Sequence, residues 1–225
     1  MISIIIPTLN EERALPQCLH SNAMKSDEIE IIVVDGGSSD RTVEIVKKHR
    51  GIRLLASERG RAAQMNAGAE IAGAEWLLFL HADTLLPDNA IQKIKSLTTD
   101  EDIKAGCFHH RFSDDHFLLR IISWLHNWRF KQTHIIYGDQ CMFIRNTLFK
   151  ELGAFPNVEI LEDIIFSEKL KKLTTPILLD EAVVTDSRKF IQRGILRSFF
   201  DVLLIISCYE LKISIMSRSF FADIR

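Results

Sequence analysis

The stretch Trp76-Leu77-Leu78-Phe79-Leu80-His81-Ala82-Asp83-Thr84 decides the fold of this chain. Five large apolar residues in a row are too few for an ordinary helix, and they predict a strand buried on both faces. In an open α/β sheet, ligands bind beyond the carboxyl ends of the strands, so this strand would carry His81 and Asp83 to a binding site. The alternative is that Asp83 only caps the turn that leads to a helix after Pro87.

Two earlier segments repeat the order strand, polar turn, helix. The β-branched runs Ile2 to Ile6 and Ile29 to Val34 predict strands. The first is followed by a loop in which Asn10 is the predicted N-cap of a helix reaching about His20, and the second by a Gly- and Ser-rich turn in which Asp40 can cap the next helix. This repetition is typical of parallel βαβ units, so the chain is predicted to be an α/β protein with a mixed, mostly parallel central sheet flanked by helices.

Two arginines stand at the start of a predicted helix that is rich in small residues. The helix follows a short strand, Ile52 to Ala56, and its alanines imply close packing on the sheet. Cations are unfavourable near a helix N-terminus, so Arg59 and Arg61 are unexpected there. A bound anion such as a diphosphate would explain them, and the alternative is two solvated arginines.

Three later segments each admit a structural and a functional interpretation. Trp124 and Trp128 lie four residues apart in a predicted helix from Phe117 to Phe130, where core packing is favoured over a stacking platform for a sugar. Glu162-Asp163 opens another helix, which the helix dipole alone would explain. From Ile195 to Ile213 the apolar residues step by threes and fours, and packing within the protein or in a homodimer is favoured over contact with a membrane surface.

The composition excludes several classes of protein. The chain has 225 residues, 47% hydrophobic and 26% charged, which fits one globular domain with a small appendage. A formal net charge of −2 gives no field that would favour nucleic acid. The 4 cysteines are scattered, which argues against a cysteine zinc site or a disulfide framework and suits a reducing cytosol. No signal peptide or spanning helix is predicted, so we expect a cytoplasmic protein, with the inner membrane face as an alternative location.

Five motifs in this order and spacing resemble the family-2 glycosyltransferases of the GT-A fold. They are Ile4-Ile5-Ile6-Pro7-Thr8-Leu9-Asn10-Glu11-Glu12, Val33-Val34-Asp35-Gly36-Gly37-Ser38-Ser39-Asp40, Asn66-Ala67-Gly68, Phe79-Leu80-His81-Ala82-Asp83 and Glu162-Asp163. The resemblance covers about residues 1–190 and leaves 191–225 as a C-terminal helical extension. His81-Ala82-Asp83-Thr84 and Tyr137-Gly138-Asp139-Gln140 look most like the bacterial subgroup called selenodomain-associated or arsenosugar-biosynthesis glycosyltransferases.

The resemblance implies an inverting transfer of sugar from a nucleotide-diphosphate sugar, with a UDP-sugar favoured, to an acceptor hydroxyl. It implies that Asp83 holds Mn²⁺ or Mg²⁺, although His81 replaces the first aspartate of the family's Asp-x-Asp motif. It implies Asp163 as the general base, with Glu162 beside it, and Gly138, Asp139 and Gln140 near the donor or acceptor sugar. The residues it implies for binding the nucleotide or the donor are Pro7, Thr8, Asn10, Glu12, Asp35, Arg59, Arg61, Gln64, Asn66, His81 and Arg188.

The acceptor is open between a small molecule and a lipid-linked one. A nucleotide-sugar-binding protein of the same fold that has lost transfer is the alternative function, since the first aspartate is missing. A phosphatase of the haloacid-dehalogenase type would need a nucleophilic aspartate where His81 stands, and a dinucleotide oxidoreductase would need a Gly-x-Gly-x-x-Gly turn that this chain lacks.

Overall fold

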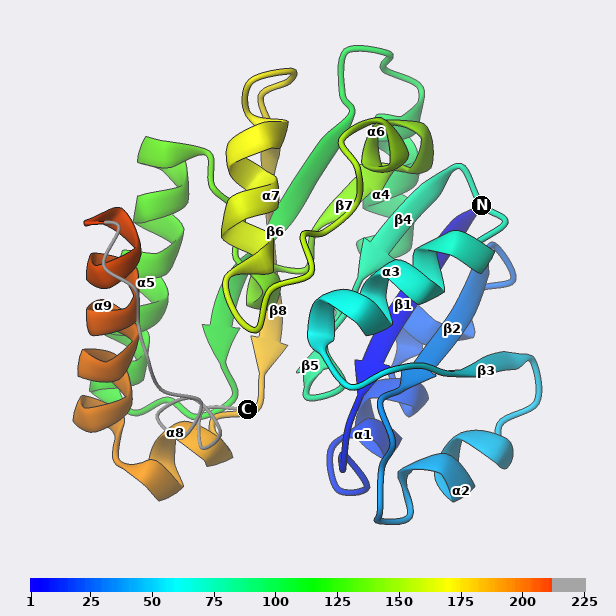
Figure 1. Cartoon of the computed structure of the whole chain (residues 1–225), viewed down its shortest axis with the longest axis horizontal. Coiled ribbons are helices and arrows are strands. Elements are labelled where there is room, and N and C mark those ends of the chain that lie inside the picture. Colours follow the sequence, from blue (N-terminus) through cyan, green and yellow to red (C-terminus); the bar gives the residue numbers. More distant parts are fainter. Residues whose placement is uncertain (212–225) are drawn as a thin grey trace.

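The predicted central strand lies in the middle of an eight-stranded mixed sheet in the computed structural model, which describes residues 1–211 (Figure 1). The strands are β1 (Ile2–Thr8), β2 (Ile29–Asp35), β3 (Ile52–Ala56), β4 (Trp76–Phe79), β5 (Thr84–Leu85), β6 (Ala105–Phe112), β7 (Phe143–Arg145) and β8 (Ile177–Thr185). Their order is β3-β2-β1-β4-β7-β6-β8-β5. β3, β2, β1 and β4 are mutually parallel, as are β6 and β8, while β7 and β5 run antiparallel to their neighbours. The predicted α/β class with a mixed sheet is confirmed.

Helices cover both faces of this sheet. They are α1 (Leu15–His20), α2 (Thr42–Lys47), α3 (Arg61–Ile71), α4 (Ala90–Thr98), α5 (Phe117–Thr133), α6 (Asn146–Glu151), α7 (Glu162–Leu170), α8 (Arg188–Arg193) and α9 (Ile195–Glu210), with 3-10 turns η1 (Asn22–Lys25) and η2 (Gly138–Gln140). One core packs α1, α2 and α4 against the sheet, and a second packs α3, α5, α6 and α7 against the other face. β4 contributes to both cores and its residues are at most 3% exposed, so the prediction of a strand buried on both faces is confirmed.

Helix α3 lies unusually close to the sheet, as its small residues predicted. A Cβ atom added at Gly68 would lie 2.5 Å from Ile5 Cγ2 and 3.1 Å from Val34 Cγ2, so only glycine fits there. This close approach brings Gln64, in the first turn of α3, against the carboxyl ends of β1 and β2.

Two local predictions in the first half of the chain were wrong. Asn10 does not cap a helix: α1 begins only at Leu15, and Asn10 has a left-handed φ of 56°. Its side chain accepts from the N–H of Ser39 in the neighbouring loop instead. The segment after Asp83 is not simply a loop, because Thr84 and Leu85 pair with the end of β8.

Between Ile135 and Ile144 only β7 is a strand, and it follows the turn η2. β8 pairs with β6 through an irregular register at Phe108/His109 of β6. One prediction in the second half of the chain was also wrong. Trp124 and Trp128 do not pack in the core. They are 62% and 51% exposed and stack on each other at a centroid separation of 6.4 Å.

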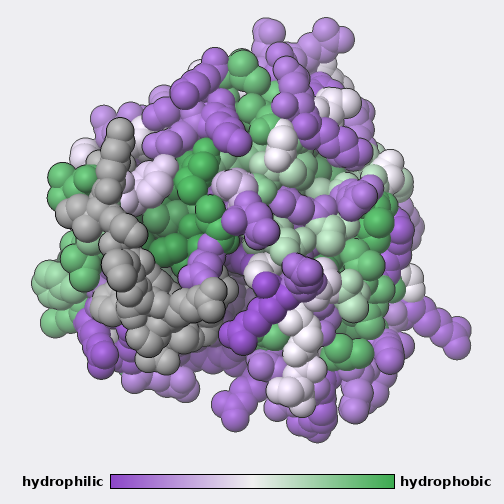
Figure 2. Space-filling model, viewed as in Figure 1, coloured by the Kyte–Doolittle hydropathy of each residue, from purple (hydrophilic) through white to green (hydrophobic). Residues whose placement is uncertain are grey.

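The helices α5 and α9 lie side by side at one end of the sheet and leave apolar residues exposed (Figure 1). On α5 these are Phe117, Ile121, Trp124 and Trp128, and on α9 they are Leu196, Phe200, Leu203 and Leu204. Figure 2 shows hydrophobic residues gathered on this side of the molecule. Ile213, the last residue of the predicted apolar face, lies outside the described residues. Among residues 1–211, no helix combines the length and the apolar character needed to cross a bilayer.

Candidate active site

Two loops at the carboxyl ends of β1 and β2 are fastened to each other by side chains that the sequence had singled out. Asp35, at the end of β2, is 6% exposed and accepts hydrogen bonds from the backbone N–H groups of Gly37 and Ser38, both at 2.9 Å. Asn10 donates its backbone N–H to Ser38 Oγ at 2.9 Å. The two predicted nucleotide-binding loops therefore lie together at the predicted edge of the sheet.

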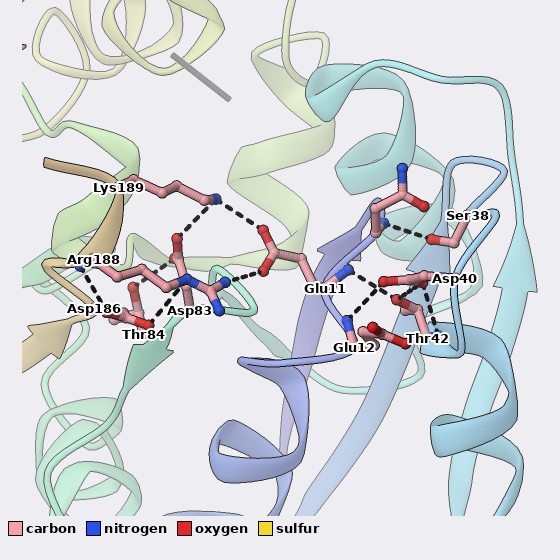
Figure 3. Close-up of polar contacts among 11 residues, drawn as sticks. Glu11, Glu12, Ser38, Asp40, Thr42, Asp83, Thr84, Asp186, Arg188 and Lys189 are labelled. Atoms are coloured by element: carbon pink, nitrogen blue, oxygen red, sulfur yellow. Dashed lines mark hydrogen bonds and ion pairs between the residues drawn. The ribbon is translucent and has the colours of Figure 1, made fainter. Parts of the chain in front are cut away.

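Glu12 also joins the two loops. Its backbone N–H donates to Asp40 (Figure 3). Its carboxylate accepts from the backbone and the guanidinium of Arg41, which lower its pKa. Pro7 and Thr8 end β1, where Thr8 is buried and donates to Val34 O.

Gln64 and Asn66, both predicted to bind the donor, have structural partners. The Gln64 amide nitrogen donates to Thr8 O at 2.7 Å and to Val34 O at 2.9 Å, so it links the ends of β1 and β2. The Asn66 amide makes a pair of hydrogen bonds with the backbone N–H and C=O of Phe155. Both ends of the Asn66 amide are occupied in this way, and donor binding by Asn66 and by Gln64 stays a prediction.

Asp83 meets a basic segment that comes from the far end of the chain (Figure 3). Lys189 Nζ lies 3.2 Å from Asp83 Oδ2 and 2.9 Å from Glu11 Oε1, and Arg188 donates to Glu11 Oε2 at 3.0 Å. Burial would lower the pKa of Lys189, but the carboxylates of Asp83 and Glu11 raise it, so the ammonium stays charged. Sequence reasoning had selected Asp83 and Arg188 as site residues but had not selected Glu11.

The donor set around Asp83 suits a hard divalent cation. Two carboxylates, Asp83 and Glu11, converge on the single point where the Lys189 ammonium now lies. Mg²⁺ and Mn²⁺ are held by one or two carboxylates together with phosphate oxygens of a substrate. Asp83 and Glu11 would hold such an ion if Lys189 moved toward the phosphates. His81 is partly buried, and the loss of solvent around its ring, assisted by the nearby charge of Arg61, lowers its pKa to about 4, so it is present as neutral imidazole.

The predicted base lies at the start of α7, in a buried group of charges. Glu162 is fully buried and forms an ion pair with Arg61, while Asp163 is 7% exposed. Asp163 Oδ2 accepts from Gly138 N–H at 2.6 Å and Oδ1 from Ile164 N–H at 2.8 Å. Burial raises the pKa of Asp163 to about 6, against the opposing charge of Arg61.

The pairing of Arg61 with Glu162 changes the interpretation of the two arginines. Burial would lower the pKa of Arg61, but the carboxylates of Glu162 and Asp163 raise it. The guanidinium therefore stays charged and paired with Glu162. Arg59 is exposed in the turn before α3. Of the predicted anion-binding cations, the structure therefore brings Arg188 close to Asp83, accompanied by Lys189.

The turn η2 connects the base to the rest of the site. A Cβ atom at Gly138 would lie 2.9 Å from the His81 ring and 3.2 Å from Asp163 Oδ2, so η2 is pressed between these two residues. Gln140 is buried and accepts from Tyr137 N–H at 3.2 Å. Asp139 faces two histidines, His110 and His126, which sequence reasoning had not selected.

A cleft of about 300 Å³ opens between the N-terminal loops and α8. It is lined by Asn10, Glu12, Arg13, Asp40, Arg188, Lys189 and Gln192. The cleft thus combines residues of the two predicted nucleotide loops with the basic residues that lie beside Asp83.

Comparison with known proteins agrees with this arrangement. The profile described as Glycosyl transferase family 2 matches residues 3–151, which is more than half of the chain. The chain belongs to glycosyl transferase family 2. The matched segment includes Asp35 and Asp83, while Glu162, Asp163 and Arg188 follow it.

Individual members of family 2 are similar over different lengths. The PGL/p-HBAD biosynthesis glycosyltransferase of Mycobacterium bovis (strain BCG / Pasteur 1173P2) is 43% identical over 162 residues, which cover 69% of this chain and 52% of that protein. The poly(ribitol-phosphate) beta-N-acetylglucosaminyltransferase TarP of Staphylococcus aureus (strain N315) is 31% identical over 102 residues, which cover 41% of this chain and 31% of TarP. The chain spans about half the length of the mycobacterial relative it matches.

Solved structures of similar fold include two glycosyltransferases. Residues 1–349 of S. aureus TarS give a TM-score of 0.68 at 22% identity, covering 89% of this chain and 64% of that chain. The mannosyltransferase PcManGT from Pyrobaculum calidifontis, solved in complex with GDP-Man and Mn²⁺, gives a TM-score of 0.68 at 22% identity, covering 98% of this chain and 66% of that chain. These likenesses establish the shared GT-A fold of this family 2 member.

Proposed function

We propose that this family 2 glycosyltransferase is an inverting enzyme that moves a sugar from a nucleoside diphosphate sugar to an acceptor hydroxyl. The observation that carries the proposal is the buried Asp163 carboxylate, fixed by two backbone N–H groups at the same edge of the sheet as Asp83 and its cationic partners. A carboxylate whose pKa is about 6 is ionised at neutral pH and still basic enough to take a proton.

In the proposed reaction, Asp163 removes the proton of the acceptor hydroxyl as its oxygen attacks the anomeric carbon. The bond from that carbon to the diphosphate breaks on the opposite face, and the nucleoside diphosphate leaves with the bonding electrons. Lys189 and Arg188 lie close to Asp83 and would bind the charge that develops on the diphosphate. A divalent ion held by Asp83 and Glu11 would supply further charge neutralisation there.

The nucleotide would lie over the loops after β1 and β2. Asp35 and the loop of Asn10 and Glu12 are fastened together and border the cleft, which supports their assignment to the base and ribose. We propose a UDP-sugar as the donor, because solved structures of TarS, a protein of the same fold, are described with UDP and with UDP-GlcNAc. GDP-mannose is the donor to compare with it, since PcManGT was solved with GDP-Man.

We also propose a narrower subgroup, a role for η2, a division into domains and a location. His81-Ala82-Asp83-Thr84 and Tyr137-Gly138-Asp139-Gln140 support the selenodomain-associated or arsenosugar-biosynthesis subgroup, with η2 near the transferred sugar or the acceptor. Residues 1–190 would form the transferase domain and 191–225 a helical extension, and the protein would act in the cytoplasm.

The exposed face of α5 supports an acceptor that is attached to lipid. Phe117, Ile121, Trp124 and Trp128 form one exposed stripe, and α5 carries the exposed cations Arg120 and Lys131 but no acidic residue. Tryptophan favours the interface between water and lipid, and basic residues favour anionic head groups. We therefore propose a membrane surface, rather than a second copy of this chain, as the partner of the exposed face of α5.

Calorimetric titration with UDP and with GDP, each with and without Mn²⁺, tests the proposal first. Tight binding of UDP that strengthens with Mn²⁺ supports a UDP-sugar transferase, and tighter binding of GDP would overturn the choice of donor. Release of UDP from a UDP-sugar in the presence of acceptor alcohols then separates an enzyme from a binding protein. Asp163→Asn should abolish that release while UDP affinity is kept, and equal loss of both would refute the assignment of the base.

A further inference from the structure

Three side chains that can bind a metal meet beside the turn η2, and none of them is one of the carboxylates that converge on Lys189. They are His110 from β6, His126 from α5 and Asp139 from η2, and one ligand atom from each lies within 4.8 Å of the other two. Asp139 Oδ1 is 3.2 Å from His126 Nε2, and Asp139 Oδ2 is 3.7 Å from His110 Nε2. The three groups come from elements that are distant in sequence, so the fold itself builds the cluster.

These atoms are buried but are not satisfied by hydrogen bonds. The His110 side chain is 1% exposed, and neither of its ring nitrogens has a hydrogen-bond partner. His126 Nε2 and Asp139 Oδ1 are close together, yet their orientation forms no hydrogen bond, and both are buried. Buried polar atoms nearly always have a partner, so this group of unpartnered atoms calls for a ligand.

The protonation states are those that a metal ion needs. Burial lowers the pKa of His126 to about 4 and that of His110 below its usual value, so both rings are neutral at physiological pH. Burial opposes ionisation of Asp139, but His126 and His110 lower its pKa, so it is ionised. Two neutral imidazoles and one carboxylate can thus each supply a lone pair, with a single negative charge to offset the cation.

We propose that His110, His126 and Asp139 bind a divalent transition-metal ion, for which Zn²⁺ is the best match. Imidazole nitrogens prefer ions of intermediate softness, such as Zn²⁺, over the Mg²⁺ that suits the two carboxylates around Lys189. Three protein ligands leave one position of a zinc tetrahedron open for water or a hydroxyl group. The scattered cysteines argue only against a cysteine zinc site, so this site does not conflict with the composition.

The site requires only a small adjustment to hold the ion. With bonds of about 2.0 Å, tetrahedral ligands lie roughly 3.4 Å apart. Since the ligand atoms lie within 4.8 Å of one another, the most distant pair must approach by at most about 1.4 Å. His126 and Asp139 can provide this movement, because their side chains are 14% and 32% exposed. The guanidinium of the nearby Arg129 stacks on the ring of Tyr137, with its central carbon 3.3 Å from the ring centroid.

A metal ion here would also act on the transfer site. Asp139 and Gly138 are consecutive residues of η2, and the Gly138 N–H is one of the two donors that fix the Asp163 carboxylate. An ion bound to Asp139 would therefore hold η2 in place and withdraw Asp139 from any sugar hydroxyl. The inference goes beyond the proposed function, and its test does not depend on transfer activity.

The experiment uses the full chain without an affinity tag, freed of metal by dialysis against a chelator. Calorimetry with Zn²⁺ should show one tight site, and Co²⁺ should add visible d–d absorption bands that Zn²⁺ removes. Asp139→Asn and His126→Gln each remove one ligand at a partly exposed position. Because loss of a group that merely orients a ligand weakens metal binding about 10- to 100-fold, loss of a ligand should weaken it by at least about 100-fold.

His20→Gln is the matched control, because it removes a histidine that is exposed and hydrogen-bonded to Pro16 O. It should leave the Zn²⁺ affinity and the Co²⁺ bands unchanged. UDP affinity with Mn²⁺ should be the same in His126→Gln as in the parent protein, which separates this site from Asp83. Absence of a Zn²⁺ site in the parent, or undiminished affinity in whichever of the two ligand variants folds, would overturn the proposal.

Discussion

Replacing Asp163 by asparagine should make the protein inactive and more stable at the same time. In the folded protein the pKa of Asp163 is about 6, against an ordinary value of 3.8, because burial disfavours the charge. At pH 8 the ionised carboxylate therefore costs the fold about 3 kcal/mol. Asparagine removes the charge but keeps only one good acceptor for the N–H groups of Gly138 and Ile164, which loses about 1 kcal/mol. The variant should be more stable by about 1 to 2 kcal/mol.

The stability difference between the variant and the parent should depend on pH. The folded state holds the Asp163 proton more tightly than the unfolded state, so the protein loses stability as pH rises from about 4 to about 6 and is then constant in this respect. The free energy of unfolding of Asp163→Asn should accordingly exceed that of the parent at pH 8, and this difference should vanish near pH 4. Urea unfolding at several pH values measures it, with the exposed Asp27→Asn as control. A variant less stable than the parent at pH 8, or one that retains transfer, would refute the reasoning.

Three further predictions concern other parts of the molecule. Gly68→Ala should lower the free energy of unfolding by about 1 to 3 kcal/mol, because its methyl group would overlap Ile5. In the control Gly73→Ala the added methyl group meets nothing closer than 3.8 Å, so the free energy of unfolding should change by less than about 0.5 kcal/mol. Equal effects of the two substitutions would contradict this account. Asp83→Ala should remove the increase in UDP affinity that Mn²⁺ produces in calorimetry, and an unchanged increase would place the metal elsewhere. Trp128→Ser should weaken sedimentation with anionic vesicles without altering thermal stability, since this side chain is 51% exposed, and unchanged sedimentation would count against a membrane surface.

The sequence predicts best what depends on nearest neighbours in the chain. The apolar runs of β1, β2 and β4 are buried strands as predicted, since short apolar segments between turn residues have few other ways to bury their side chains. The closeness of α3 to the sheet also follows from its small residues, and the structure shows its cause at Gly68.

What the sequence could not predict depends on partners far along the chain. The Asp83–Lys189 pair spans 106 residues, and β5 exists only because the end of β8 pairs with it. His110 and His126 look like ordinary residues of a strand and a helix until η2 brings Asp139 to them. Trp124 and Trp128 have the spacing of a core helix, and that spacing cannot tell which face the sheet will cover.

The short ladder between β5 and β8 has a consequence for the rate of turnover. Asp186 N–H donates to Asp83 O at 2.9 Å, and the hydroxyls of Thr84 and Thr185 lie 3.1 Å apart, so the segment that carries Lys189 starts from a fixed point beside Asp83. Opening it as a lid would break these bonds. We therefore expect the spent nucleotide to leave when Lys189 rotates back to its carboxylates, a side-chain movement of nanoseconds rather than the microseconds to milliseconds of a loop. The rate of turnover would then be set by the chemical step or by dissociation of the nucleotide, and not by the opening of a lid.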